Sequence, residues 1–199
     1  MKILALELSS GQGSIAWRED GAEIVEQLFA NDRKHSGLFF EHMERFSQRF
    51  GAADVIVVGL GPGSYAGTRI AIAAAFGLRA AQKTKLIGLP SICAIDTGSR
   101  EYCVVGDARR QSFFFARVSD GQCIEGPSLY SPAELEGKIR ECGVPIYCST
   151  PLPQFPRTMM AFPSAKKLAE LAHHRADKIT ETVLLEPIYL REPHITVPK

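Results

Sequence analysis

The sequence predicts an α/β protein built from two similar halves, each forming one lobe. Short apolar runs typical of strands alternate along the 199 residues with longer segments of helical periodicity. Three strands, a helix, a strand and a second helix follow one another in the first half, and much the same order recurs in the second. We place the boundary near residue 98, so that the N-terminal lobe covers 1–98 and the C-terminal lobe covers 99–199.

In the first half, three strands come first and a helix follows a polar segment. The aromatic residues Phe39, Phe46 and Phe50, together with Met43, recur on one face of the predicted helix 36–50. Because the run Val55–Leu60 is apolar at every position but Gly59, we expect a strand covered on both faces. The complete prediction is strands at 3–8, 14–18 and 23–29, a helix at 36–50, a strand at 55–60, a helix at 68–82 and a strand at 86–89.

In the second half, one helix has a particularly clear start. Ser131 and Glu134 form a capping box around Pro132 at the first helical position, and Gly143 follows the predicted helix 132–142. The other elements are strands at 102–106, 112–118, 122–126 and 144–148, a proline-rich loop at 151–163 and a helix at 164–175. This duplicated order is the one expected of the ribonuclease H-like fold of actin and sugar kinases, the ASKHA fold.

The composition is that of an ordinary globular protein. Hydrophobic residues make up 45% and charged residues 23%, and the formal net charge of +1 excludes binding to nucleic acid or acidic membranes by bulk charge alone. The five cysteines include no C-x-x-C pair, which argues against a disulfide framework and a cysteine zinc site. A carboxylate at Glu7 interrupts the N-terminal apolar run, and no run approaches a membrane span, so we expect a soluble, cytoplasmic protein.

The glycine-rich segment 59–67 joins a strand to a helix and is the most informative motif of the chain. Gly61, Gly63 and Gly67 allow a positive φ or close backbone approach. Such a segment can present N–H groups to an anion at the start of a helix, but it matches neither a complete G-x-G-x-x-G nor a Walker A motif. The alternative is a tight turn that lets the helix pack against the strand.

The helix 68–82 has unusually small side chains, because alanine and glycine occupy about half of its positions. It could be wedged against its own sheet, or one face could pack against a partner protein. The neighbouring helix 36–50 has Leu38 and Phe40 in addition to its main stripe, more apolar surface than one core face needs. We expect Phe40 in particular to be exposed in the monomer.

Other polar residues suggest little chemistry. The five histidines show no ligand spacing, and no G-x-S-x-G elbow supports a serine nucleophile, so we expect no metal and no catalytic residue. Glu7 ends the first strand, where nucleotide-binding members of the fold hold a metal–phosphate group, although a solvated carboxylate is an equal alternative. Arg109 and Arg110 could bind phosphate or carboxylate, or form a plain charged hairpin.

Taken together, several segments resemble the TsaB (YeaZ) family of tRNA threonylcarbamoyladenosine synthesis. They are Ile3-Leu-Ala-Leu-Glu-Leu-Ser-Ser10, Arg33-Lys-His-Ser36, Gly61-Pro-Gly-Ser-Tyr-Ala-Gly-Thr-Arg-Ile70, Asp107-Ala-Arg-Arg110 and Pro187-Ile-Tyr-Leu-Arg191. The match covers nearly the whole chain. It departs from the family where Glu7-Leu8-Ser9 replaces Asp-Thr-Ser and where Ser64-Tyr-Ala-Gly-Thr-Arg69 replaces Ser-Phe-Thr-Gly-Leu-Arg.

The resemblance implies a two-lobed, non-catalytic scaffold rather than an enzyme. Family members pair with the catalytic paralogue TsaD, whose H-x-x-x-H metal motif is missing from this sequence, and the pair recruits the ATPase TsaE. The assembly transfers threonylcarbamoyl to N6 of A37 in tRNA, which this chain would contact only through the complex. It also implies a partner interface on the two N-lobe helices, here Leu38, Phe39, Phe40, Met43, Arg69, Ile70, Ala73, Ala74, Gly77 and Ala81. A homodimer through the same helices is a further possibility.

Two other functions remain open from the sequence. An ATP-dependent phosphotransferase of the same fold would bind its nucleotide at a site that the resemblance treats as vestigial: Glu7, Ser9, Ser10, Gly61, Gly63 and Ser64. The replaced Asp-Thr pair counts against it, and we expect no cofactor. A self-standing peptidase lacks a nucleophile–base pair.

Overall fold

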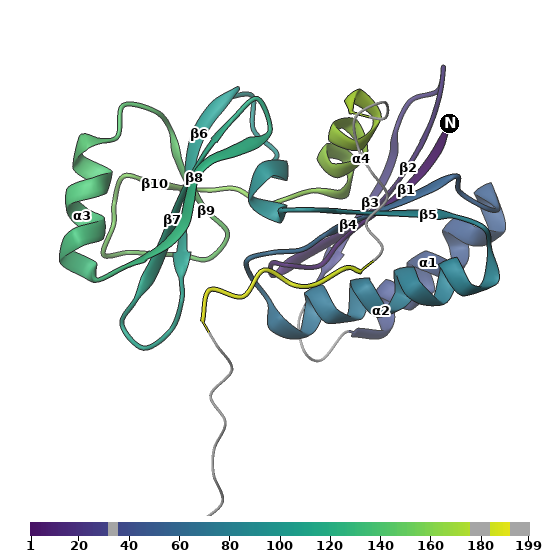
Figure 1. The fold of residues 1–199 in the computed structure, drawn as a ribbon, viewed down its shortest axis with the longest axis horizontal. Coiled ribbons are helices and arrows are strands. Elements are labelled where there is room, and N and C mark those ends of the chain that lie inside the picture. The colour runs from purple at the N-terminus through teal and green to yellow at the C-terminus, as the bar shows by residue number, and fades with distance from the viewer. Residues whose placement is uncertain (32–35, 176–183, 192–199) are drawn as a thin grey trace, which may run out of the picture.

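Two mixed five-stranded sheets form the protein, one from each half of the chain (Figure 1). This computed structural model describes residues 1–31, 36–175 and 184–191. The first half contains β1 (Lys2–Glu7), β2 (Gln12–Glu19), β3 (Val25–Ala30), α1 (Ser36–Phe50), β4 (Val55–Gly59), α2 (Tyr65–Ala81), β5 (Lys85–Leu89) and the 3-10 turn η1 (Ser91–Ala94). The second half contains β6 (Glu101–Asp107), β7 (Phe113–Ser119), β8 (Gln122–Tyr130), α3 (Pro132–Glu141), β9 (Ile146–Cys148), β10 (Thr158–Met160) and α4 (Ala165–His174).

The two sheets have the same topology. The first runs β3-β2-β1-β4-β5, with antiparallel pairing from β3 to β1 and parallel pairing from β1 to β5. The second runs β8-β7-β6-β9-β10 with the same pattern of directions. The predicted fold class, a duplicated two-lobed α/β fold of the ASKHA type, is confirmed.

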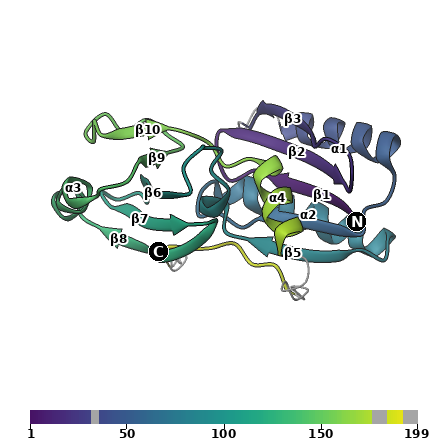
Figure 2. The same cartoon turned by 90° about the horizontal axis from the view of Figure 1, so that it is seen from above.

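Helices cover both faces of the first sheet (Figures 1 and 2). On one face, Ile56 and Val58 of β4 pack in a core with residues of α1 and α2. On the other face, Val55 and Val57 pack in a second core with residues of α4. This two-sided burial explains why the β4 segment is apolar without alternation, as the sequence predicted.

Helix α4 lies beyond residue 98 in the chain but packs on the first sheet. Its first main-chain N–H, at Ala165, donates to Ser14 Oγ of β2 at 2.7 Å, and Leu168 is completely buried against β1 and β4. The later segment 184–191 also returns to this half, where Leu185 joins the core beneath α2 and Ile188 N donates to Leu60 O at 2.8 Å. The division of the chain at residue 98 stays a prediction, while these two segments contribute to the packing of the first half.

The second half contains one strand that the sequence did not predict, and β8 continues to Tyr130 and does not end at 126. The proline-rich segment 151–163, expected to be a loop, contains the three-residue strand β10. It pairs in parallel with β9, where Met159 lies opposite Tyr147. Helix α3 begins as expected, because Ser131 N donates to Glu134 Oε2 at 2.8 Å and the capping box is complete.

Candidate functional site

The glycine-rich segment between β4 and α2 brings the start of α2 directly onto the turn after β1. A Cβ at Gly63 would lie 2.1 Å from Ser9 O, and Ser64 N donates to the same oxygen at 2.6 Å. A Cβ at Gly67 would lie 2.0 Å from Leu8 O. Gly61 has a φ of +85°, which favours glycine. The geometry therefore supports the packing interpretation of this segment.

Glu7, at the end of β1, is a buried carboxyl group and not the solvated one considered from the sequence. Its side chain is fully buried, and Oε1 accepts a hydrogen bond from Ser9 N at 2.6 Å. Oε2 has no hydrogen-bond partner among the residues that the structure describes, and it faces Gly59, where a Cβ would lie 1.8 Å away. Burial raises the pKa of Glu7, while contacts with Ser9 and Ser91 act in the opposite direction.

The other residues of the candidate nucleotide site are close together but occupied with one another. Ser9 and Ser10 are both buried in the turn after β1, and Ser10 Oγ donates to Gln12 O at 2.8 Å. Gly61 N donates to Ser91 Oγ at 2.9 Å, and Ser64 Oγ caps α2 by accepting from Gly67 N at 3.2 Å. These groups form the turn and the cap, a role that serine often has.

Helices α1 and α2 present the candidate partner face, on the side of the first sheet away from α4 (Figure 1). Phe40 is 52% exposed, as predicted, whereas Phe39 is only 2% exposed and belongs to the core. Met43 is half-buried against the same core, and Leu38 is half-buried. Phe39 therefore lies beneath the candidate partner face and not on its surface, in contrast to its place in the predicted interface.

The outer face of α2 is a stripe of small residues. The exposed members are Ala66, Arg69, Ala73, Gly77, Ala80 and Ala81, and Ile70 and Ala74 are half-buried beside them. Ala71 and Ala75 are fully buried on the opposite side, against the sheet. Packing against its own sheet and packing against a partner both have a structural basis, since one face of α2 is buried on the sheet and the other is exposed.

Arg69, the only charged member of the stripe, is held by two tyrosines that the sequence did not single out. Its Cζ lies 3.9 Å from the centroid of the Tyr65 ring and 5.7 Å from that of Tyr189. Arg69 Nε donates to Tyr189 Oη at 2.9 Å. Tyr189 of the segment Pro187–Arg191 therefore binds an arginine at the edge of the candidate partner face.

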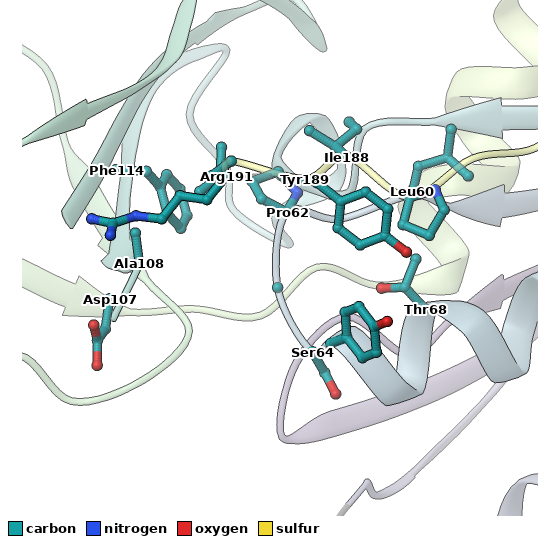
Figure 3. A pocket seen from close by; sticks show the side chains of 14 residues that line it. Leu60, Pro62, Ser64, Thr68, Asp107, Ala108, Phe114, Ile188, Tyr189 and Arg191 are labelled. Carbon is teal, nitrogen blue, oxygen red and sulfur yellow. The ribbon is translucent and has the colours of Figure 1, made fainter. Parts of the chain in front are cut away.

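A cavity of about 170 Å³ lies beside this arrangement, between the two halves of the chain (Figure 3). Ser64 and Thr68 of the first half line one side, and Asp107 and Ala108 line the other. Arg191 extends along the wall on the side of Asp107 (Figure 3). The segment 187–191 thus bridges the two halves.

The turn between β6 and β7 places Arg109 and Arg110 in solvent. Both have positive φ values, 66° and 52°, and Gln111 follows at 55°, which is uncommon for residues other than glycine. Asp107 Oδ1 accepts from Arg109 N at 2.6 Å, so the turn is stabilised by its own carboxylate. Arg109 Nη1 also lies 3.6 Å from Asp107 Oδ2, and both arginine side chains are exposed. This geometry fits a charged hairpin.

The histidines are dispersed. His42 is buried on α1 with its ring centroid 5.1 Å from that of Phe29, and burial lowers its pKa. His173 Nδ1 lies 3.4 Å from Asp20 Oδ1, whereas His35 and His194 lie outside the described residues. Within the described ranges there is no group of three or more His, Cys, Asp or Glu side chains placed to hold a metal ion. No helix in the same ranges has the length and apolarity to cross a membrane.

Comparison with known proteins relates this geometry to a family. Residues 33–169 match the family model described as TsaD, tRNA N6-adenosine threonylcarbamoyltransferase. An uncharacterized protein of Mycobacterium leprae is 38% identical over 91 residues, covering 42% of this chain and 23% of that protein. An uncharacterized protein of Mycobacterium tuberculosis is 33% identical over 150 residues, covering 70% of this chain. The chain spans 65% of the length of the second relative and less than a quarter of the first.

Among solved structures, YeaZ from Pseudomonas aeruginosa matches with a TM-score of 0.74 and 21% identity, over 95% of this chain and 99% of that one. A second structure from the same organism, described as similar to the peptidase YEAZ, has the same TM-score at 20% identity. At this identity the likeness establishes the fold. Since the family model covers more than half of the sequence, the chain belongs to the tRNA N6-adenosine threonylcarbamoyltransferase (TsaD) family and has the fold of YeaZ, as its resemblance to the TsaB (YeaZ) proteins predicted.

Proposed function

We propose that this chain is a non-catalytic, cytoplasmic subunit that pairs with a TsaD-type threonylcarbamoyltransferase and supports its action on adenosine 37 of tRNA. Membership of the family supports the link to this reaction. The sequence has no H-x-x-x-H pair such as the catalytic paralogue carries, which supports an accessory role. Glu7 and the glycine segment would then be a vestige of the nucleotide site of the fold.

The open face of α1 and α2 is the observation that most supports pairing. Phe40 is half-exposed at one end, and the outer stripe of α2 has alanine or glycine at Ala73, Gly77 and Ala81. Small residues allow a helix of another subunit to approach closely, while an exposed aromatic ring provides apolar area to bury. Two helices of the partner would complete a four-helix contact, on which the ATPase TsaE could then assemble.

The same face could hold a second copy of this chain when the partner is absent. A twofold contact would place α1 and α2 against their own counterparts. We expect such a homodimer to dissociate in favour of the heterodimer, because both use the stripe around Ala73.

The test is co-expression with the TsaD protein of the same organism, followed by light scattering of the purified sample. A one-to-one complex is expected with the native chain and should be lost with Ala73→Arg, which places a long charged side chain in the middle of the stripe. Ala133→Arg is the matched control, because Ala133 is also an exposed helical alanine but lies on α3. If Ala73→Arg and Ala133→Arg pair equally well, the face is wrong.

Calorimetric titration with Mg-ATP provides a second test. The scaffold proposal expects no tight binding by the isolated chain, because Ser64 N and Ser9 O bind each other where a phosphate would need the N–H group. Tight magnesium-dependent binding would contradict it and would favour the phosphotransferase alternative.

A further inference from the structure

Two cysteines of the second half lie in direct contact. Cys103 Sγ on β6 is 3.2 Å from Cys142 Sγ, which follows the last residue of α3. A disulfide bond needs the sulfur atoms about 2.05 Å apart, so the two thiols would have to approach each other by only about 1.2 Å. No disulfide was expected from the spacing of the cysteines, because the contact is formed by the tertiary fold and not by a local motif.

The backbone fixes both cysteines in this arrangement. Cys103 N donates to Pro145 O at 2.8 Å, within the pairing of β6 with β9. Cys142 N donates to Ile139 O at 3.3 Å, and Cys142 O accepts from Arg157 Nη2 at 2.8 Å. Arg157 also binds Arg140 O at 3.1 Å, so one guanidinium group holds the end of α3 in place. The backbone of each cysteine is therefore held by hydrogen bonds, from the main chain at Cys103 and from the main chain and the Arg157 side chain at Cys142.

The two thiols differ in access to solvent. Cys103 is completely buried, and burial, together with its contact to Cys142, raises the pKa of its thiol to about 12. Cys142 is only half-buried. A small oxidant would thus reach Cys142 first, while the buried Cys103 thiol stays in contact with it and is shielded from the solvent.

We propose that Cys103 and Cys142 are a redox modification site that a peroxide converts reversibly into a disulfide bond. In the first step the Cys142 thiolate attacks one oxygen of hydrogen peroxide, the O–O bond breaks, and the leaving hydroxide takes up the thiol proton to form water. Cys142 is then a sulfenic acid. In the second step the Cys103 sulfur attacks the Cys142 sulfur, the S–O bond breaks, and the hydroxyl group leaves as water with the Cys103 proton. Two thiols and one peroxide give one disulfide and two water molecules, and a dithiol reductant reverses the change.

The bond would join the central strand of the second sheet to the end of α3. Its position is remote from α1 and α2, which cover the other sheet (Figure 1). The modification therefore does not depend on the proposed function, and its test is independent of pairing.

The test is peptide mapping of the full chain after treatment with hydrogen peroxide and alkylation of the remaining thiols. Tryptic cleavage places Cys103 in 101–109 and Cys142 in 141–157, which also contains Cys148. The expected product is a link between these two peptides with the loss of two hydrogen atoms. It should persist in a Cys148→Ala variant, disappear in Cys142→Ala and be reversed by dithiothreitol.

One further variant tests the assignment of roles, and three results would overturn the proposal. In Cys103→Ala, a sulfenic acid should be trapped by dimedone at Cys142, because the resolving thiol is gone. Loss of the link in Cys148→Ala would overturn the proposal, as would alkylation of both Cys103 and Cys142 after peroxide treatment. A disulfide found only between 86–100 and 118–138, which contain Cys93 and Cys123, would overturn it as well.

Discussion

Replacement of Glu7 by glutamine should change how the stability of this protein depends on pH. The carboxyl group is fully buried, and only one of its oxygens has a hydrogen-bond partner among the described residues, namely Ser9 N. Burial raises its pKa in the folded state above the unfolded value of about 4.3. Glutamine has nearly the same shape, can accept the same hydrogen bond and does not ionise.

The sign follows from proton linkage. Between the unfolded and the folded pKa the folded state binds more protons than the unfolded state, so stability is lost as the pH rises. The contribution of the Glu7 proton is fully present below about pH 4.3 and disappears when the pH passes the folded pKa. Stability falls by at most about 1.4 kcal/mol for each pH unit crossed in this window, which limits the loss by pH 7 to roughly 4 kcal/mol. Glu7→Gln should gain up to this amount relative to the native chain.

Urea denaturation of both proteins at several pH values between about 4.5 and 8 would measure the difference. Glu134→Gln is the control, because the hydrogen bonds from Ser131 lower the pKa of this exposed carboxylate. The ionised Glu134 stabilises the native chain above its unfolded pKa, and this stabilisation is lost as the pH falls. The free energy of unfolding of Glu134→Gln should therefore drop below that of the native chain as the pH rises. Parallel stability curves for the native chain and Glu7→Gln would refute the reasoning.

Three further changes test the packing around the first sheet. Gly63→Ala should destabilise the fold by about 3 kcal/mol or more in urea denaturation, because its Cβ would overlap a main-chain oxygen, whereas Gly11→Ala, with no described atom within 4 Å, should change stability by less than about 1 kcal/mol. Leu168→Ala should cost about 3 kcal/mol, because the side chain is fully buried between α4 and the first sheet, and a cost below about 1 kcal/mol would contradict that packing. Tyr189→Phe should cost about 1 kcal/mol through loss of its hydrogen bond with Arg69, and an unchanged unfolding curve would show that this bond contributes nothing.

The sequence predicted most elements because their signals are local. The capping box at Ser131 and the apolar run of β4 each depend on a few neighbouring residues, and both were confirmed. Helix α2 begins at Tyr65 and not at Thr68, because Ser64 Oγ accepts a hydrogen bond from Gly67 N and caps it there. The sequence placed the start too late because glycine is unfavourable within a helix. Strand β10 was missed because three residues among prolines give no periodic pattern.

The arrangement of the site was less predictable, because it depends on long-range packing. The apolar stripe of α4 shows that one face is buried, but only the fold shows that this face lies on the first sheet. Glu7 was considered as a solvated group since carboxylates are rarely buried, and its burial follows from the close approach of Gly59. The contact of Arg69 with Tyr189 joins positions 120 residues apart, which no local pattern reveals.

At Gly77, the stability of the isolated chain and its pairing with a partner favour different residues. It lies inside α2, where glycine costs about 1 kcal/mol relative to alanine, and a Cβ there would meet no described atom within 4 Å. The monomer therefore gives no reason for glycine at this exposed position. Gly77→Ala should raise the stability of the isolated chain by about 1 kcal/mol and weaken its pairing with a TsaD-type partner, if a helix approaches closely there. Greater stability with unchanged pairing would mean that the contact does not reach this part of the stripe, and the interface would have to be confined to the end of α2 near Arg69.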